Sequence, residues 1–346
     1  MNHGAPSYLP IEYKEKYEIF LVKRGDYVIA LTRPILSRQL KMAAVDEVFD
    51  GALLNQRVGK LVTTQNISFV YFLLQTSKVI NDLEKSISGS EPPNLSVQQI
   101  EDIKTYIPSE REQQKIADCL FSVDDLITAQ SKKLDTLKAH KKELMQQLFP
   151  AEGETLPKLR FPEFRDAGEW ENPTLDEISV PAVDRVGDRK FGRDISGNQY
   201  RLYTLIRDGD FVYNKGNSIK FPQGCVYDLR NWAEVAAPNV FICFRLKEDY
   251  LNGFFRYCFE KNMHGVQLKK HITSGARSNG LLNISKDAFF GVRIPSPRPE
   301  EQKKIADCLA SLDDLILAQT QKLDTLKAHK KGLMQQLFPT LDKAQG

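Results

Sequence analysis

A long internal repeat constrains this chain more than any other feature. Residues 112–150 and 301–339 align without a gap, and 32 of their 39 positions are identical at a period of 189 residues. Solenoids and propellers repeat every 20–50 residues or so, and this period is far longer. The pattern predicts two large units, each a variable head followed by a near copy of one segment. The expected boundaries are a first head at 1–108, a segment at 109–150, a second head at 151–298, a segment at 299–339 and a tail at 340–346.

The repeated segment has the heptad pattern of a helix that pairs with another helix. Its apolar residues alternate at spacings of three and four, with Gln130, Lys141, Gln319 and Lys330 as polar interruptions. Both copies end at a Phe-Pro pair, which disfavours further helix. Two amphipathic helices on separate cores are the alternative, which a stripe this narrow disfavours. We expect antiparallel helix pairing through Ile116, Leu120, Val123, Ile127, Leu134, Leu137, Leu144, Ile305, Leu309, Leu312, Ile316, Leu323, Leu326 and Leu333.

The second head has the pattern of an α+β domain. Strand-like stretches at Tyr200–Leu205, Asp210–Tyr213, Gly224–Tyr227 and Val240–Leu246 are separated by Gly, Pro and Asn. A helix is expected at Gly253–Asn262, and a short strand before the second long helix. Cys119 and Cys308, beside the helix-pairing stripe, are expected to be small buried packing residues.

The first head repeats part of the second. Gly25-Asp26-Tyr27-Val28 matches Gly209-Asp210-Phe211-Val212, and a Ser-Gly pair followed by Asn94-Leu95-Ser96 matches one followed by Asn283-Ile284-Ser285. The segment PKLRFPEF at 157–164, followed by GEWE, has no counterpart near Met1. We therefore expect the first head to lack an N-terminal portion of roughly some tens of residues.

Composition and missing motifs argue against several classes of function. The five cysteines are scattered and odd in number, with no CxxC pair, so neither a disulfide framework nor a zinc site is expected. No apolar run approaches the length of about 20 residues that a membrane span needs, and no signal peptide is evident, so an intracellular protein is expected. A phosphate-binding GxxxxGK[ST] loop is missing. We expect no catalytic residues, no metal and no cofactor, although dispersed nuclease carboxylates are harder to exclude.

Taken together, the motifs resemble the DNA-specificity subunit of type I restriction–modification systems. The resemblance rests on PKLRFPEF with GEWE, on Gly-Asp-(Phe/Tyr)-Val, on Ser-Gly…Asn-(Leu/Ile)-Ser, and on the twice-repeated segment from Glu-Gln-x-Lys-Ile-Ala to Leu-Phe-Pro, and it covers nearly the whole chain. It implies an α+β fold class with two target-recognition domains, each followed by a long helix, and the helices pairing as an antiparallel coiled coil.

The resemblance also implies a function. Each head would bind one half of a bipartite site in double-stranded DNA, and the helices would set the gap between the halves. The helices would also dock two methyltransferase subunits, to which restriction subunits are added, in the cytoplasm and without catalysis by this chain. A truncated or rearranged copy, acting as a half-functional or inactive coiled-coil scaffold, is the alternative.

Candidate DNA contacts are clusters of cations, amides and hydroxyls in loops, the groups that bind phosphates and base edges. Ordinary solvated loops are the alternative for each cluster. The strongest cluster is the stretch 269–280, followed by the stretch after the Gly-Asp-Phe-Val strand and by its counterpart in the first head. The candidates are Lys269, Lys270, His271, Ser274, Arg277 and Asn279; Lys215, Asn217, Ser218 and Lys220; and Arg33, Arg38, Gln39 and Lys41.

Overall fold

The protein folds into two compact units, each holding one head and a part of both long helices. Unit 1 comprises residues 1–132 and 320–346, and unit 2 comprises residues 133–319. The computed structural model describes residues 8–87, 92–187, 197–215, 220–272 and 282–339. Among these residues, no helix combines the length and apolar character needed to cross a membrane.

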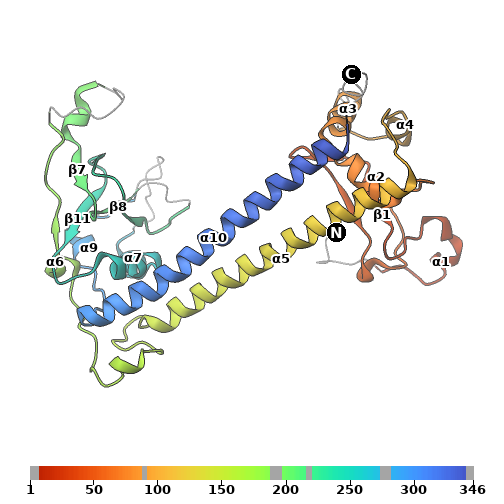
Figure 1. Ribbon diagram of the computed structural model, residues 1–346. Coiled ribbons are helices and arrows are strands. Elements are labelled where there is room, and N and C mark those ends of the chain that lie inside the picture. The colour runs from red at the N-terminus through yellow and green to blue at the C-terminus, as the bar shows by residue number, and fades with distance from the viewer. Residues whose placement is uncertain (1–7, 88–91, 188–196, 216–219, 273–281, 340–346) are drawn as a thin grey trace. The chain divides into compact units, whose positions relative to one another are not determined.

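The repeated segments are the long helices α5 (Glu110–Leu148) and α10 (Pro299–Leu337), as the heptad pattern predicts (Figure 1). In unit 1, Ile116 and Leu120 near the start of α5 share an apolar cluster with Leu333 and Leu337 near the end of α10. In unit 2, Leu148 at the end of α5 shares a cluster with the first turns of α10. The helices are therefore antiparallel within each unit, and the predicted pairing is confirmed.

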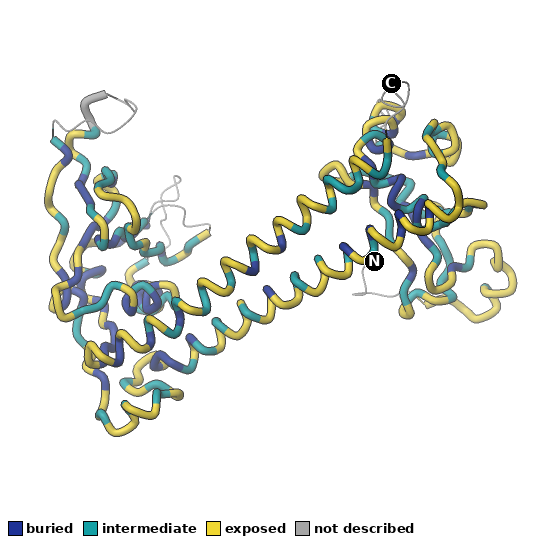
Figure 2. The backbone as a smooth tube through the Cα atoms, viewed as in Figure 1, coloured by how far each residue is buried: buried dark blue, intermediate teal, exposed yellow. Residues whose placement is uncertain are grey.

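The burial of the predicted pairing residues is consistent along both helices. All of them are buried or half-buried, and buried positions recur along both helices between exposed ones (Figure 2). The polar interruptions Gln130, Gln319, Lys141 and Lys330 are also at least half-buried. The prediction for the cysteines is wrong in one case and only partly right in the other: the side chain of Cys119 is exposed and that of Cys308 half-buried. Both lie one position before a seam leucine, on the flank of the stripe.

The head of unit 1 is a small sheet with helices. It begins with α1 (Tyr13–Lys16) and the 3-10 turn η1 (Glu18–Phe20). Its three-stranded antiparallel sheet has the order β4-β1-β5, from β1 (Tyr27–Ala30), β4 (Met42–Ala44) and β5 (Val58–Lys60). The hairpin β2 (Ile35–Leu36) and β3 (Gln39–Leu40) lies between β1 and β4 in the chain. After the 3-10 turn η2 (Glu47–Phe49) and strand β5, the helices are α2 (Ile67–Leu74), α3 (Ser77–Ile87) and α4 (Val97–Glu101).

The head of unit 2 is larger. A four-stranded antiparallel sheet has the order β6-β11-β8-β9, from β6 (Ser179–Pro181), β8 (Phe211–Asn214), β9 (Cys225–Asp228) and β11 (Ile242–Leu246). A separate pair joins β7 (Thr204–Arg207) to β10 (Glu234–Ala237). Shorter elements are η3 (Pro162–Phe164), α6 (Leu175–Ile178), η4 (Gly197–Leu202), α7 (Asn252–Glu260), α8 (Met263–Leu268), η5 (Lys269–His271) and α9 (Lys286–Phe290).

Some predicted elements of the second head are wrong in detail. The strand expected at Tyr200–Leu205 is a 3-10 turn followed by β7, and β10 was not expected. The short strand expected before α10 is two isolated bridges, Thr174 with Arg293 and Glu171 with Ser296. Each bridge joins two residues that lie more than a hundred positions apart in the chain. A local sequence pattern cannot show such a contact.

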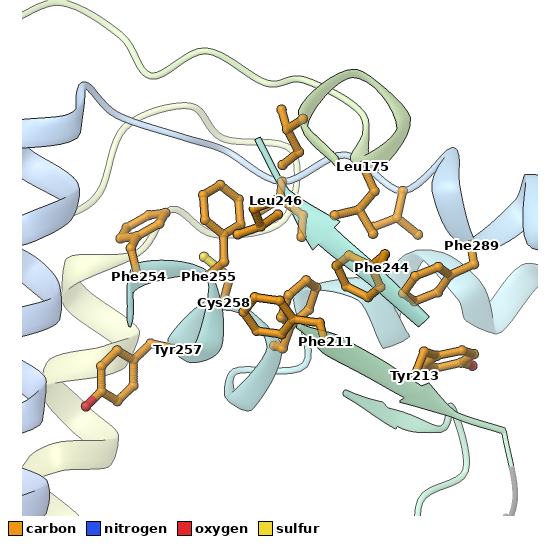
Figure 3. Close-up of a cluster of buried hydrophobic side chains, with 14 of the residues drawn as sticks. Leu175, Phe211, Tyr213, Phe244, Leu246, Phe254, Phe255, Tyr257, Cys258 and Phe289 are labelled. Atoms are coloured by element: carbon orange, nitrogen blue, oxygen red, sulfur yellow. The ribbon is translucent and has the colours of Figure 1, made fainter. Parts of the chain in front are cut away.

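An aromatic core holds the second head together. Phe211 of β8 stacks on Phe244 of β11 with ring centroids 5.4 Å apart, and Tyr213 stacks on Phe289 of α9 at 4.4 Å (Figure 3). Phe254 and Tyr257 of α7 are fully buried in the same cluster, together with residues of both long helices. Aromatic side chains bury large areas and pack at defined angles, so this core fixes the orientation of β8 and of the chain that follows it.

Candidate nucleic-acid interface

The Gly-Asp-(Phe/Tyr)-Val motif builds the strand that carries the candidate loops in each head. Gly25 and Gly209 have φ values of 89° and 86°, a left-handed conformation that favours glycine. The next residue closes the turn: Asp26 Oδ2 accepts the Lys23 amide at 2.8 Å, and Asp210 Oδ2 accepts the Arg207 amide at 2.7 Å. Asp210 is fully buried and also pairs with Arg245 of β11. The motif is therefore structural, and it begins the equivalent strand in each head, β1 in unit 1 and β8 in unit 2.

In unit 1, β1 leads into an exposed hairpin that presents the predicted residues. Ser37 and Arg38 form its tip with φ values of 50° and 58°. Positive φ at both central residues is the type I′ hairpin geometry, which usually requires Gly or Asn. The buried Leu40 anchors the hairpin to the head core. Four exposed polar side chains lie on the hairpin or directly beside it: Arg33, Arg38, Gln39 and Lys41.

In unit 2, the residue after β8 is bonded to the chain that follows the predicted cluster 269–280. The carbonyl of Lys215 accepts the Leu282 amide at 2.8 Å, and Lys215 Nζ donates to the carbonyl of Ile284 at 3.2 Å. Lys215 precedes the segment 216–219, and Leu282 follows the segment 273–281. Two clusters about sixty residues apart in the sequence are therefore anchored at one place on the head.

Unit 1 has a related junction, in which the donor residue matches Ile284 of unit 2 rather than Leu282. Leu31, the residue after β1 that matches Lys215, accepts the Leu95 amide at 2.7 Å through its carbonyl. The Arg33 amide donates to the carbonyl of Pro93 at 2.7 Å. In both heads, therefore, the segment that bonds to the chain after the strand lies at the Asn-(Leu/Ile)-Ser motif. Ser96 in one head and Ser285 in the other accept a backbone amide three residues on, so this serine is the N-cap of α4 or α9.

The remaining described candidates differ in how free they are to contact a ligand. Lys269, Lys270 and His271 are exposed, and they form the 3-10 turn η5 rather than the loop expected from the sequence. Lys220 is exposed and lies over the ring of Phe221. Lys215 is half-buried, and burial, followed by the charge of Lys286, lowers its pKa. Its bond to Ile284 makes Lys215 a structural residue of the junction.

Five predicted contacts lie outside the described residues: Asn217, Ser218, Ser274, Arg277 and Asn279. Sequence reasoning missed Lys286, the exposed first residue of α9, whose charge acts on Lys215. It could have been found from its place directly after the Asn-Ile-Ser cap. With Lys215 it brings two cations to the junction in unit 2.

The described side chains form no cluster with metal-ligand chemistry: no group of three or more His, Cys, Asp or Glu could hold an ion there. His264 is the most perturbed histidine in that part of the chain, but it belongs to the core. It is buried edge-on against Tyr213 and Phe259, and burial lowers its pKa to about 4. The arrangement offers exposed cations and amides for binding.

Comparison with known proteins agrees with these features. A family model described as the type I restriction modification DNA specificity domain matches twice, over residues 6–139 and 198–328. The type I restriction enzyme MjaVIII specificity subunit of Methanocaldococcus jannaschii is 32% identical over 145 residues, 41% of this chain and 34% of the relative. The putative MjaX specificity subunit of the same organism is 24% identical over 275 residues, 71% of this chain and 60% of the relative. The chain thus spans about a third to three fifths of the length of these curated relatives.

Solved structures show the same fold. The S subunit of a type I restriction–modification system from M. genitalium matches with a TM-score of 0.55 at 14% identity, over 93% of this chain and 85% of that one. A chain from a type I system, solved to explain its complex assembly and conformational transition, matches with a TM-score of 0.53 at 16% identity, over 92% and 82%. At these identities the likeness concerns the fold alone.

Proposed function

Because the chain belongs to the family of type I restriction–modification DNA specificity subunits, we propose that its two heads bind the two halves of a bipartite DNA target. Members of this family are not enzymes themselves, and this chain accordingly supplies DNA recognition rather than catalysis. We infer that it acts on DNA in the cytoplasm.

The observation that carries this proposal is the junction found in both heads. In unit 2 the bond from Leu282 to Lys215 fixes one end of each of two polar clusters at the same place, and in unit 1 the bond from Leu95 to Leu31 fixes the chain that leads into the hairpin. Loops fixed on a rigid sheet are a usual means of presenting binding side chains. Cations among them supply phosphate contacts, while Arg, Asn and Gln can contact base edges. The heads differ in these loops and agree in the framework beneath, as expected for two different half-sites.

The repeated helices suit two copies of a partner. Leu126 of α5 and Leu315 of α10 occupy the same position of the repeat, and their side chains are 49% and 54% exposed. An exposed leucine that both helices carry at the same position of the repeat is a candidate contact for two copies of one partner. We propose that each helix presents such a site to one methyltransferase subunit and that restriction subunits join through them. The length of the helices would then set the gap between the half-sites.

DNA binding is tested with the chain assembled with its methyltransferase subunits on duplexes of varied sequence. Lys269→Ala with Lys270→Ala should weaken binding to all sequences similarly and lower the slope of log affinity against log salt by about one to two. The exposed helix residues Lys322 and Lys327, changed to Ala together, remove the same charge and should leave the slope unchanged. An unaltered slope in the Lys269 and Lys270 double variant would remove η5 from the interface.

A second measurement separates a DNA-binding subunit from a scaffold. Sequencing of methylated sites in cells that express the complete system should reveal a target with two specified halves. A complex that assembles but methylates no defined sequence would favour the scaffold function instead. A target with a single specified half would mean that only one head contacts bases.

A further inference from the structure

A cavity in unit 2 lies between α5, α7 and α10. Its volume is about 460 Å³, which is within the range of pockets that bind small molecules. Helix α5 lines the cavity with residues between 138 and 146, the end of α7 contributes Glu260 and Lys261, and α10 contributes Asp313 and Ile316. Four lysines and two acidic residues therefore surround one space.

The two acidic residues are already paired with cations. Asp313 Oδ1 lies 2.6 Å from Lys141 Nζ, and Asp313 Oδ2 accepts the Tyr257 hydroxyl at 2.7 Å. Arg256 Nη2 lies 3.6 Å from the same Oδ2. Lys141 Nζ also lies 2.7 Å from Glu260 Oε1. Because Lys141 and Arg256 balance Asp313 and Glu260, the other three lysines make the cavity positive.

Those three lysines have no carboxylate partner of their own. Lys261 Nζ donates to the carbonyls of Phe149 and Pro150 at 3.0 and 2.9 Å. An ammonium group has three N–H donors, so one is left for a ligand. Burial lowers the pKa of Lys261, and an anion beside it would therefore be stabilising. Lys138 and Lys142 are exposed, and no acidic side chain pairs with either of them among the described residues.

The rest of the lining suits a ligand larger than a simple anion. Met145 is buried and Ile316 half-buried, and they give the cavity an apolar surface. The Glu260 side chain is 46% exposed and uses Oε1 for Lys141, so its other oxygen can accept a hydrogen bond from a hydroxyl group. The exposed amide of Gln146 can donate as well as accept.

The two copies of the repeat differ at this place. Phe72 of α2 and Tyr257 of α7 are equivalent, because each ring lies under the repeated lysine of a long helix. Three and four residues later, unit 2 has its acidic residue and its buried lysine, whereas unit 1 has the neutral residues Gln75 and Thr76. The repeated helix sequence alone therefore does not account for the charges of the cavity in unit 2.

We propose that this cavity binds a small phosphate monoester that also carries hydroxyl groups, the chemistry shared by nucleotides and sugar phosphates. The phosphate accepts hydrogen bonds from Lys138, Lys142 and Lys261, since lysine binds phosphate as a point charge. A hydroxyl group donates to Glu260, and the body of the ligand covers Met145. The proposal does not rest on DNA recognition by the heads.

The test titrates the full chain with adenosine monophosphate, ribose 5-phosphate and adenosine in a calorimeter. Adenosine lacks the phosphate and should bind more weakly than adenosine monophosphate, on the order of tenfold or more. Tighter binding of adenosine monophosphate than of ribose 5-phosphate would identify a nucleotide site, and the reverse order a sugar phosphate site. Lys138→Gln with Lys142→Gln should weaken both phosphate probes on the order of tenfold. Gln146→Trp should weaken them by filling the cavity while every charge is kept.

Helix α10 supplies matched controls at the equivalent positions of the repeat. Lys327→Gln with Lys331→Gln removes the same charge from exposed positions, and Gln335→Trp adds the same bulk. Neither variant should change the affinity for the phosphate probes. In a lysine acetylation footprint read by mass spectrometry, adenosine monophosphate should protect Lys138 and Lys142 and leave Lys327 and Lys331 reactive.

Four results would overturn the proposal. Adenosine could bind as tightly as adenosine monophosphate, or the α5 and α10 lysine variants could weaken binding equally. Neither phosphate probe could bind at millimolar concentration. Finally, the Lys138 and Lys142 double variant could lose affinity for a DNA duplex while the parent chain binds neither small probe, which would assign these lysines to the DNA backbone.

Discussion

Lys330 of α10 binds both carboxylate oxygens of Asp124 of α5, with Nζ 2.6 and 2.7 Å from them. The repeat places the same pair in unit 2 with the helices exchanged: Lys141 Nζ lies 2.6 Å from Asp313 Oδ1. Each lysine also lies over an aromatic ring of its own head: Nζ is 5.3 Å from the ring centroid of Phe72 for Lys330 and 5.1 Å from that of Tyr257 for Lys141. These polar interruptions of the stripe therefore tie both helices and a head together in each unit.

Loss of one partner should destabilise unit 1 strongly. Lys330→Met leaves the half-buried Asp124 carboxylate unpaired, at an expected cost of about 1–3 kcal/mol in the free energy of unfolding. Asp124→Asn with Lys330→Met should recover part of this, with a coupling energy of about 1–2 kcal/mol. Denaturant unfolding of the parent protein, the two single variants and the double variant measures this coupling energy. The exposed neighbour Lys331→Met is the control and should change little; additive effects of the two substitutions would mean that the pair does not act as a unit.

The heptad pattern predicted this pairing well because helix periodicity is a local property. Lys141 and Lys330 could be identified as interruptions of the stripe, but their partners could not, since an aspartate on the flank carries no pattern of its own. The same holds for the heads. The Gly-Asp turn and the serine caps could be found by comparing the two halves, whereas the junction of Lys215 with Leu282 depends on a contact about 67 residues apart in the chain.

The hairpin tip of unit 1 should combine backbone strain with DNA binding. Arg38→Gly relieves a left-handed conformation that costs an L-residue about 1 kcal/mol, and it should raise the stability of unit 1 by about 0.5–1 kcal/mol. The same change removes an exposed cation and should weaken DNA binding. Unfolding experiments and fluorescence anisotropy with the assembled complex measure the two effects.

Ser37→Gly is the matched control for the hairpin. Ser37 has a similar positive φ but no charge, so this variant should gain stability and keep its DNA affinity. If both variants lose affinity equally, the hairpin's rigidity matters and the Arg38 cation does not. If neither loses affinity, the hairpin lies outside the interface.

The stability of unit 2 should fall in mild acid because of His264. Burial lowers its pKa to about 4, below the ordinary value of 6.5, so the folded state favours the neutral ring. This contribution is fully present above pH 6.5 and is lost as the pH falls from 6.5 toward 4, by up to about 3 kcal/mol. Denaturant unfolding at a series of pH values measures the loss.

His264→Gln removes the titrating group and keeps a polar side chain of similar size. Its stability should change less than that of the parent protein between pH 6.5 and 4, whatever its stability at pH 7. His140, which is exposed on α5, provides the control. His140→Gln should retain the full pH dependence, and parallel curves for the parent and the His264→Gln variant would show that the acid sensitivity has another source.

The segment 157–175, which begins with PKLRFPEF, illustrates a different limit of sequence analysis. PKLRFPEF stands out as a motif, yet its role depends on Glu301 and on the chain at 292–296, both more than a hundred residues away. The pair of Arg160 with Glu301 is buried, whereas the equivalent Glu112 in the first copy of the repeat is exposed. Local composition carries no sign of this difference, because the two helices are nearly identical in sequence.

The proposed gap-setting role of the helices is tested by lengthening both of them. The bridges from Asp124 to Lys330 and from Lys141 to Asp313 imply one antiparallel register. Seven residues inserted after Lys132 in α5 and after Gln321 in α10 therefore stay opposite each other and preserve the stripe. The insertion adds about 10 Å, or about 3 base pairs at ~3.4 Å per step, and rotates one half-site by roughly 100°.

Methylation across a library of sites that differ only in gap length measures the result. The heptad variant should prefer a longer gap, or lose methylation while each head still binds its half-site. A four-residue insertion in α5 alone is the control for pairing, and it should do worse, because it shifts the stripe out of register with α10. Full activity of the heptad variant at an unchanged optimum would show that the helices do not set the gap, and their pairing would then serve folding and docking alone.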